Sequence, residues 1–167
     1  MVGYHANDEV RCNRFLQEQD YLIISEKDTE YLGTGMYFWE HKCDAQWWLQ
    51  KKKEKGKACI VKADIRITDD NTLDLTDSDI AEKMGKLIEI IEKSEGKIFC
   101  STKSGEKLDC IFSRYTEMSK YEIIKGRRYY ESKPESSFLW GTQLTTKVND
   151  FYCVKCIAPI GEREKVA

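Results

Sequence analysis

The chain has 167 residues, of which 41% are hydrophobic and 34% are charged, so it can fold as one domain with its own apolar core. The formal net charge of −2 excludes a strong attraction of the whole molecule to nucleic acid or acidic lipid. The sequence lacks the run of about 18 apolar residues that a membrane-spanning helix needs, and its first residues do not resemble a signal peptide. Seven irregularly spaced cysteines do not fit a disulfide framework, so we expect reduced thiols and a cytoplasmic location.

The first third of the chain predicts short strands and two helices. Residues 3–6 form a candidate strand, and a helix capped by Asn7 or Asp8 follows it to about Gln19. Val10, Phe15 and Leu16 are expected on the buried side of this helix. Further along we predict an extended segment at 21–24, a polar loop at 26–30, a strand at 37–39 and a helix at 41–53.

The rest of the chain predicts one long helix and several strands. Residues 61–67 alternate apolar and charged side chains, which is typical of a half-buried strand. Apolar residues at helical spacing follow Asp77, so this residue or Ser78 caps a helix. Short β-like runs occupy 97–100, 108–112, 121–125 and 151–157. Because helices that connect strands are scarce, we expect an α+β fold with mostly antiparallel pairing.

The cysteine pattern does not predict a metal site. Cys153 and Cys156 have the C-x-x-C spacing of zinc ligands, but no second pair is placed to complete a four-ligand site. On a strand, positions three apart also face opposite sides of the sheet. We therefore expect no bound metal.

The most informative segment is Gly-Thr-Gly-Met-Tyr-Phe at residues 33–38, which follows a histidine at position 5. Two glycines permit positive φ and close approach of the backbone to a ligand. Aromatic side chains such as Tyr37 and Trp48 hold a positively charged ring, for example nicotinamide, by stacking. Short motifs of this kind also occur in ordinary strand cores, and the pattern by itself leaves both interpretations open.

The order of these motifs resembles ADP-ribosyltransferases of the diphtheria-toxin and poly(ADP-ribose) polymerase type. Gly-Tyr-His-Ala at residues 3–6 is similar to the family's first motif, in which glycine usually follows the histidine. Residues 33–38 are similar to the second motif, Gly-x-Gly-Ile-Tyr-Phe. Trp48 follows Tyr37 by eleven positions, where the family carries another aromatic residue. The resemblance covers roughly residues 3–50.

The resemblance implies a site that binds NAD as co-substrate. His5 would bond to the nicotinamide-side ribose and to the adjacent backbone, and Ala6 would offer its backbone groups to the carboxamide. Tyr37 would stack on the nicotinamide ring, with Trp48 closing the other side. The other cofactor-binding residues that it implies are Ser25, Gly33 and Gly35.

The third catalytic position departs from the family. The resemblance places a glutamate there, which contacts the ribose 2′-hydroxyl and stabilises the oxocarbenium-like transition state, whereas this chain has Gln143. Losing one such electrostatic contact costs on the order of 3 kcal/mol. Three explanations stay open: a native His-Tyr-Gln catalytic set, an engineered Glu→Gln change, or a true carboxylate at Glu131 or Glu135.

The implied protein is a single ADP-ribosyltransferase-like catalytic domain over residues 1–167, with the fold of a split β-sandwich: two antiparallel sheets with flanking helices. The implied activity is transfer of ADP-ribose from NAD to a macromolecular acceptor, RNA, DNA or protein. Its compact size is typical of a toxin or antiviral defence effector, with an antitoxin protein as a possible partner and no membrane association. The alternatives are an NAD- or ADP-ribose-binding pseudo-enzyme, an NAD glycohydrolase and an RNA 2′-phosphotransferase of related fold, although the last needs more cationic side chains than these motifs supply.

Overall fold

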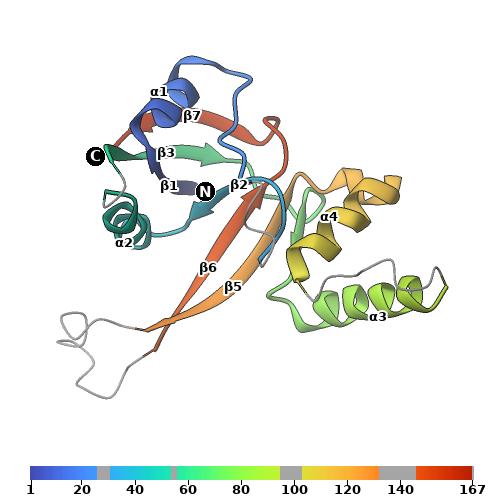
Figure 1. The fold of residues 1–167 in the computed structure, drawn as a ribbon. Coiled ribbons are helices and arrows are strands. Elements are labelled where there is room, and N and C mark those ends of the chain that lie inside the picture. Colours follow the sequence, from blue (N-terminus) through green and yellow to red (C-terminus); the bar gives the residue numbers. More distant parts are fainter. Residues whose placement is uncertain (26–30, 54–55, 95–102, 132–145, 167) are drawn as a thin grey trace.

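The computed structural model describes residues 1–25, 31–53, 56–94, 103–131 and 146–166, which form an α+β fold around one seven-stranded sheet (Figure 1). Its strands are β1 (Val2–Asp8), β2 (Met36–Trp39), β3 (Ala58–Ile65), β4 (Thr72–Asp74), β5 (Ile123–Glu131), β6 (Thr146–Val154) and β7 (Ile160–Lys165). Its helices are α1 (Glu9–Gln17), α2 (Lys42–Lys53), α3 (Ser78–Ser94), α4 (Ser104–Arg114) and the 3-10 helix η1 (Thr116–Lys120). None of the helices in these ranges has the length and apolar character that crossing a bilayer requires.

The sheet differs from the two antiparallel sheets that we expected. Hydrogen bonds join all seven strands into one mixed sheet, in the order β4-β5-β6-β2-β1-β3-β7. β4 and β5 are parallel, and the other neighbours are antiparallel. Parallel neighbours need a long crossover connection, and α3, α4 and η1 lie on the chain between these two strands.

The parallel pair of β4 and β5 was not predicted, because helix α4, which belongs to the connection between them, was not recognised as a helix. The apolar run at 108–112 was interpreted as a strand, which is wrong, because these residues belong to α4. The buried residues of this helix are Gly105, Leu108 and Ile111, and their spacing of three places them on one helical face. The predicted strand at 97–100 lies outside the described residues.

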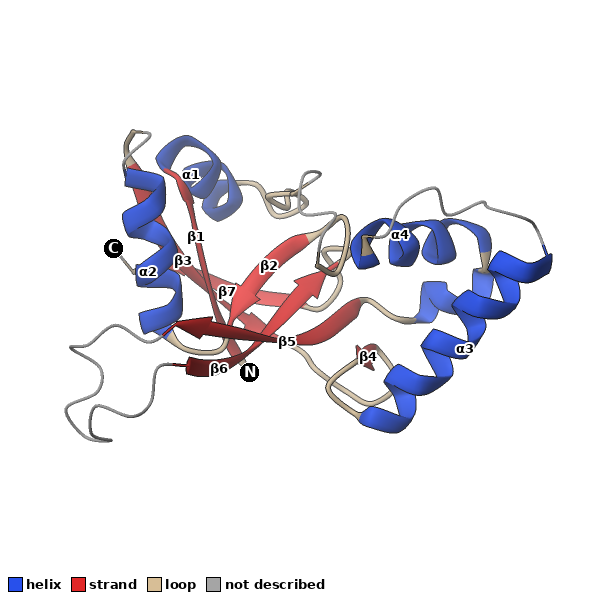
Figure 2. Ribbon diagram, turned by 60° about the horizontal axis from the view of Figure 1, so that its bottom comes forward, coloured by secondary structure: helices blue, strands red, loops and turns tan. Residues whose placement is uncertain are grey.

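Apolar side chains cover both faces of the sheet. Buried and more exposed residues alternate over 61–65 of β3, so the predicted half-buried strand is confirmed there. The strand begins earlier than predicted, and Cys59 and Ile60, which precede Val61, are buried as well. Ile60 belongs to a cluster on the face that α2 and α4 cover, and its two neighbours belong to a cluster on the face of α1. Figures 1 and 2 show α1 and α2 at one end of the molecule and α3 and α4 at the other.

Helix α1 follows β1 directly and begins as predicted. The Asp8 side chain accepts a hydrogen bond from the backbone N–H of Arg11, 2.9 Å, which is an N-cap contact. Val10 is 78% exposed, so its predicted burial is wrong; the buried residues of α1 are Cys12 and Phe15. At the other end, the Arg163 guanidinium donates to three carbonyls of residues 15–19 and stabilises the helix C-terminus.

Candidate active site

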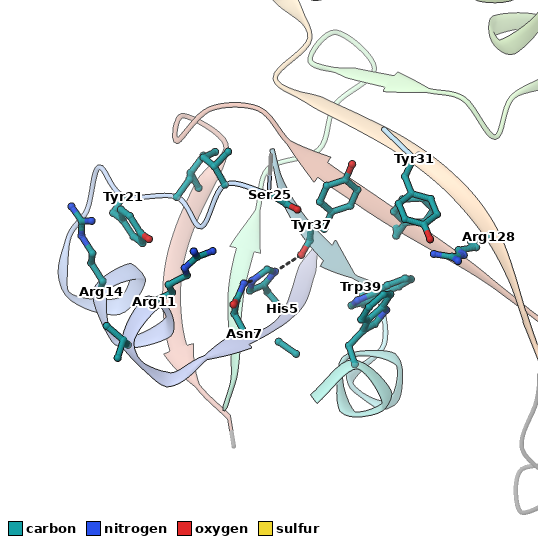
Figure 3. A pocket seen from close by; sticks show the side chains of 16 residues that line it. His5, Asn7, Arg11, Arg14, Tyr21, Ser25, Tyr31, Tyr37, Trp39 and Arg128 are labelled. Carbon is teal, nitrogen blue, oxygen red and sulfur yellow. Dashed lines mark hydrogen bonds between the residues drawn. The ribbon is translucent and has the colours of Figure 1, made fainter. Parts of the chain in front are cut away.

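A cleft opens where β1 and β2 separate. β1 pairs with β3 along its whole length but has one registered partner in β2, Tyr4 opposite Trp39. Beyond that pair lies a cleft of about 880 Å³ (Figure 3), a size that suits an organic cofactor. It is lined by His5, Ala6, Asn7, Val10, Arg11, Arg14, Tyr21, Leu22, Ile24, Ser25, Tyr31, Tyr37, Trp39, Trp48, Arg128 and Phe151.

His5 joins the two sequence motifs at the base of this cleft. Its Nδ1 lies 2.6 Å from the carbonyl oxygen of Tyr37. Because a carbonyl oxygen can only accept a hydrogen bond, Nδ1 carries the hydrogen and donates it. The Asn7 side chain accepts from the Asp8 backbone N–H through Oδ1, 2.9 Å, so its Nδ2 is the atom that donates to His5 Nε2, 3.1 Å away. These bonds assign His5 as the neutral tautomer with its hydrogen on Nδ1.

Tyr37 is fixed by its hydroxyl and by its ring. The hydroxyl donates to the Gly33 carbonyl at 2.6 Å and accepts from the Leu32 N–H at 3.1 Å. The ring stacks on Phe151, with centroids 6.0 Å apart and planes 20° apart. The tyrosine is therefore already positioned for a planar ligand, because its rotation is restricted at both ends.

The wall beside Tyr37 is a continuous row of aromatic rings. Trp39 lies 5.5 Å from Phe151 and stacks on Trp48 at 6.2 Å and 22°. Trp47 meets Trp48 edge-on. Tyr37 and Trp48 thus line the same cleft, as expected, but two further rings, Phe151 and Trp39, stand between them in the row. The sequence interpretation assigned Trp39 only to the strand and did not single out Phe151.

The two glycines of the motif lie where a side chain would clash with neighbouring residues. Gly33 has φ of +80°, and a Cβ there would lie 2.3 Å from an oxygen of Asp109. A Cβ on Gly35 would lie 2.4 Å from the Cys153 Sγ. Asp109 accepts hydrogen bonds from the backbone N–H and the hydroxyl of Thr34, all at 2.9 Å. Packing of the loop on α4 and β6 therefore explains the need for glycine at both positions.

Ser25 and Ala6 both reach the cleft, as the resemblance implied. Ser25 donates its backbone N–H to the Gly35 carbonyl at 2.9 Å, which ties the 21–25 segment to the glycine loop. Ala6 is buried and lines the cleft beside His5. The structure thus brings these two residues together with His5, Tyr37 and Trp48 at one site.

Sequence reasoning gave no site role to three polar residues of the cleft, Asn7, Arg11 and Arg14, whereas it named Arg128 as a residue that could join a phosphate-contacting surface beside the site. Asn7 lies two positions after His5 on a strand, and this period of two places both side chains on one face. Arg11 and Arg14 are three apart on α1, which also places them on one face. Both spacings were available as signals in the sequence. Arg128 comes from β5, and its guanidinium carbon lies 4.2 Å from the centroid of the Tyr31 ring; no local pattern predicts that contact.

Most of the candidates for the third catalytic position lie outside the described residues. Gln143 and Glu135 lie there, and Glu131 is the last residue of β5. A buried carboxylate, Asp44, accepts a hydrogen bond from Asn149 at 2.9 Å. Asp44 precedes Trp48 by one helical turn and Asn149 precedes Phe151 by two strand positions, so this pair adjoins the aromatic row.

The described residues do not bring three potential metal ligands among His, Cys, Asp and Glu together. Comparisons with known protein families, with curated proteins and with solved structures found no match for this chain. What the site does must therefore be argued from the cleft residues and their order along the chain.

Proposed function

We propose that this protein is an NAD-dependent mono-ADP-ribosyltransferase of the family that its motifs resemble. The observation that carries the proposal is the hydrogen bond between His5 and the Tyr37 backbone, which unites the two motifs at the base of an aromatic cleft. The single pair that joins β1 to β2 supports a finer proposal for the fold, an ADP-ribosyltransferase-like split β-sandwich in which the sheet opens around NAD.

The cleft offers suitable partners to the nicotinamide half of NAD. The positively charged ring stacks on Tyr37, because the ring faces of aromatic side chains attract cations. His5 and Asn7 contact the adjacent ribose: a ribose hydroxyl replaces the Asn7 N–H as the donor to His5 Nε2, and the Asn7 amide then donates to a ribose hydroxyl. Ala6 and Ser25 lie close enough in the fold to border the carboxamide.

In the proposed reaction the bond between the ribose C1′ and the nicotinamide nitrogen breaks, and its electron pair leaves with neutral nicotinamide. A nucleophile of the acceptor forms a new bond to C1′ from the opposite face and loses its proton, so the configuration inverts. Gln143 is the residue that the resemblance assigns to the ribose 2′-hydroxyl. The acceptor is RNA, DNA or protein, and the role is that of a toxin or defence effector, for which an antitoxin is a possible partner.

A second candidate is a protein that binds NAD or ADP-ribose without turnover. Among the described residues that line the cleft, none is a carboxylate. A cleft that stacks nicotinamide but places no full negative charge beside C1′ binds the ground state without stabilising the developing cation.

The test is release of nicotinamide from labelled NAD by the purified protein, alone, with cell lysate and with total RNA. We expect His5→Ala and Tyr37→Ala to reduce release at least tenfold, because each removes a group that orients the ribose or the ring. His41→Ala is the matched control, because the chain has two histidines and His41 is exposed. NAD binding without release would favour the second candidate, and NAD binding that both variants retain would refute the assigned site.

A further inference from the structure

One end of the cleft carries two arginines that the nicotinamide site does not use. Arg11 and Arg14 extend from one face of α1, and both line the cleft together with Tyr21. Figure 3 shows this group on the side of His5 opposite to Tyr31 and Arg128. A ligand that extends from Tyr37 past His5 toward α1 therefore meets two guanidinium groups.

Both guanidinium groups are oriented by carboxylate contacts that they make through Nε. Arg14 donates through Nε to both Glu18 oxygens at 2.9 Å, and its guanidinium carbon lies 4.1 Å from the Tyr21 ring centroid. Arg11 contacts Asp8 through Nε at 3.4 Å. Within the described part of the chain, these carboxylate contacts engage Nε and not the Nη groups, which are the ends that form paired bonds with phosphate.

We propose that Arg11 and Arg14 bind the diphosphate of a dinucleotide, so that its adenosine half lies along α1 and the 21–24 segment. This inference rests on the proposed function, since it takes the nicotinamide end to be at Tyr37. A diphosphate carries two negative charges next to each other, which matches two guanidinium groups on one helical face. Tyr21 and Glu18 hold the Arg14 side chain in place, which lowers the entropy cost of binding.

The experiment compares ligands that differ in phosphate content. Calorimetry measures the binding of NAD, ADP-ribose, nicotinamide riboside, inorganic pyrophosphate and a single-stranded RNA oligonucleotide to the wild type, to R11Q, to R14Q and to the double variant. We expect each substitution to weaken NAD and ADP-ribose about tenfold, because a charge-assisted hydrogen bond is lost. Nicotinamide riboside has no phosphate, so its affinity should stay within about twofold.

Arg66→Gln is the matched control, because this arginine is also exposed but pairs with Glu122 in another part of the fold. It should leave all five affinities unchanged. Arg11 and Arg14 are 55% exposed, so the variants should keep the wild-type melting temperature.

Two outcomes would overturn the inference, and they differ from failure of the proposed function. If NAD binds the wild type and the double variant equally well, the arginines do not bind its diphosphate. If the double variant loses affinity only for a single-stranded RNA oligonucleotide, the arginines serve an acceptor. If the wild type binds no NAD, the proposed function fails. In that case, pyrophosphate binding that R11Q and R14Q abolish would still support an anion site at these arginines. If the wild type binds no pyrophosphate either, the anion site is refuted as well.

Discussion

The two halves of the sheet, which meet at the junction of β1 and β2, both bury apolar side chains but differ in their charged contacts. β3 buries Val61, Ala63 and Ile65 in one cluster with Phe15 of α1, which is fully buried. β5 and β6 contribute Ile123 and Val154 to the same cluster. β4, β5 and β6 also carry a charge cluster: Lys125 contacts Asp74 and Asp150, and Arg127 donates two hydrogen bonds to Asp150. The cleft lies at the junction, so it depends on both halves.

This difference tells us what each half contributes. Removing a buried side chain costs several kcal/mol, because it forfeits transfer free energy and leaves a cavity. Partly exposed ion pairs contribute about 1 kcal/mol or less each, and pH and salt change them. We therefore expect the buried side chains around α1 to contribute most to global stability, and the polar contacts of α4 to position the glycine loop. Three predictions test that division.

The largest effect is expected from Phe15→Ala. The ring is fully buried, lies 6.4 Å from the Phe38 ring and is covered by the Arg163 guanidinium at 4.4 Å. Its removal should lower the free energy of unfolding by about 3–5 kcal/mol, measured by urea titration. Val10→Ala in the same helix is the control, with an expected cost within about 0.5 kcal/mol, because Val10 is 78% exposed. Equal costs would contradict the placement of α1.

Asp109→Ala should have an intermediate effect that reaches the cleft. Asp109 accepts hydrogen bonds from Thr34 and from Lys155 Nζ at 3.2 Å, so its loss leaves these donors without that acceptor. We expect a loss of about 1–3 kcal/mol in the free energy of unfolding. NAD affinity measured by calorimetry should also fall, because the loop positions Tyr37.

The control for this variant is Asp69→Ala, since Asp69 is an exposed residue in the turn before β4. It should change neither measurement. If Asp109→Ala lowers stability but leaves NAD affinity intact, the glycine loop does not position Tyr37.

The smallest effect is expected from acid pH, which should weaken the contribution of the charge cluster to the free energy of unfolding. The Arg127 hydrogen bond lowers the pKa of Asp150 below its ordinary value of 3.8. Burial alone would raise the pKa of Asp74, but hydrogen bonds from Thr76 and Lys125 outweigh it and lower that pKa. Carboxylates with lowered pKa stabilise the folded state above the unfolded value and lose this contribution as pH falls through the folded pKa.

Stability should therefore decline as the pH falls below about 4, with about 1 kcal/mol from these two groups. Asp150→Asn should flatten the decline, measured as urea midpoints between pH 5 and pH 2, whereas Asp69→Asn should not. An unchanged slope in Asp150→Asn would show that its ion pair with Arg127 does not contribute in solution.

Local signals predicted the elements whose ends are set by neighbouring residues. Asp8 caps α1 and Asp77 caps α3, where it accepts from the N–H groups of Asp79 and Ile80, as their positions indicated. The position of β1 was predicted as well, because the aspartate that caps α1 directly follows its residues in the chain. α4 was mistaken for a strand, because five residues at 108–112 do not distinguish a period of two from one of 3.6.

The candidate site likewise has features that the local sequence predicts and features that it does not. The sequence by itself determined the order of the motifs, a histidine, a glycine turn and an aromatic pair, and this order resembles that of NAD-cleaving enzymes. It also contained the spacing of His5 and Asn7 and that of Arg11 and Arg14, which local periodicity places on common faces.

Only the tertiary structure decided how these pieces meet. The bond from His5 to the Tyr37 carbonyl spans 32 positions, and the stacking of Tyr37 on Phe151 joins β2 to β6. The support of the glycine loop by Asp109 depends on a helix that arrives through a crossover connection. Such contacts follow from sheet order and register, which nonlocal packing sets and no short segment encodes.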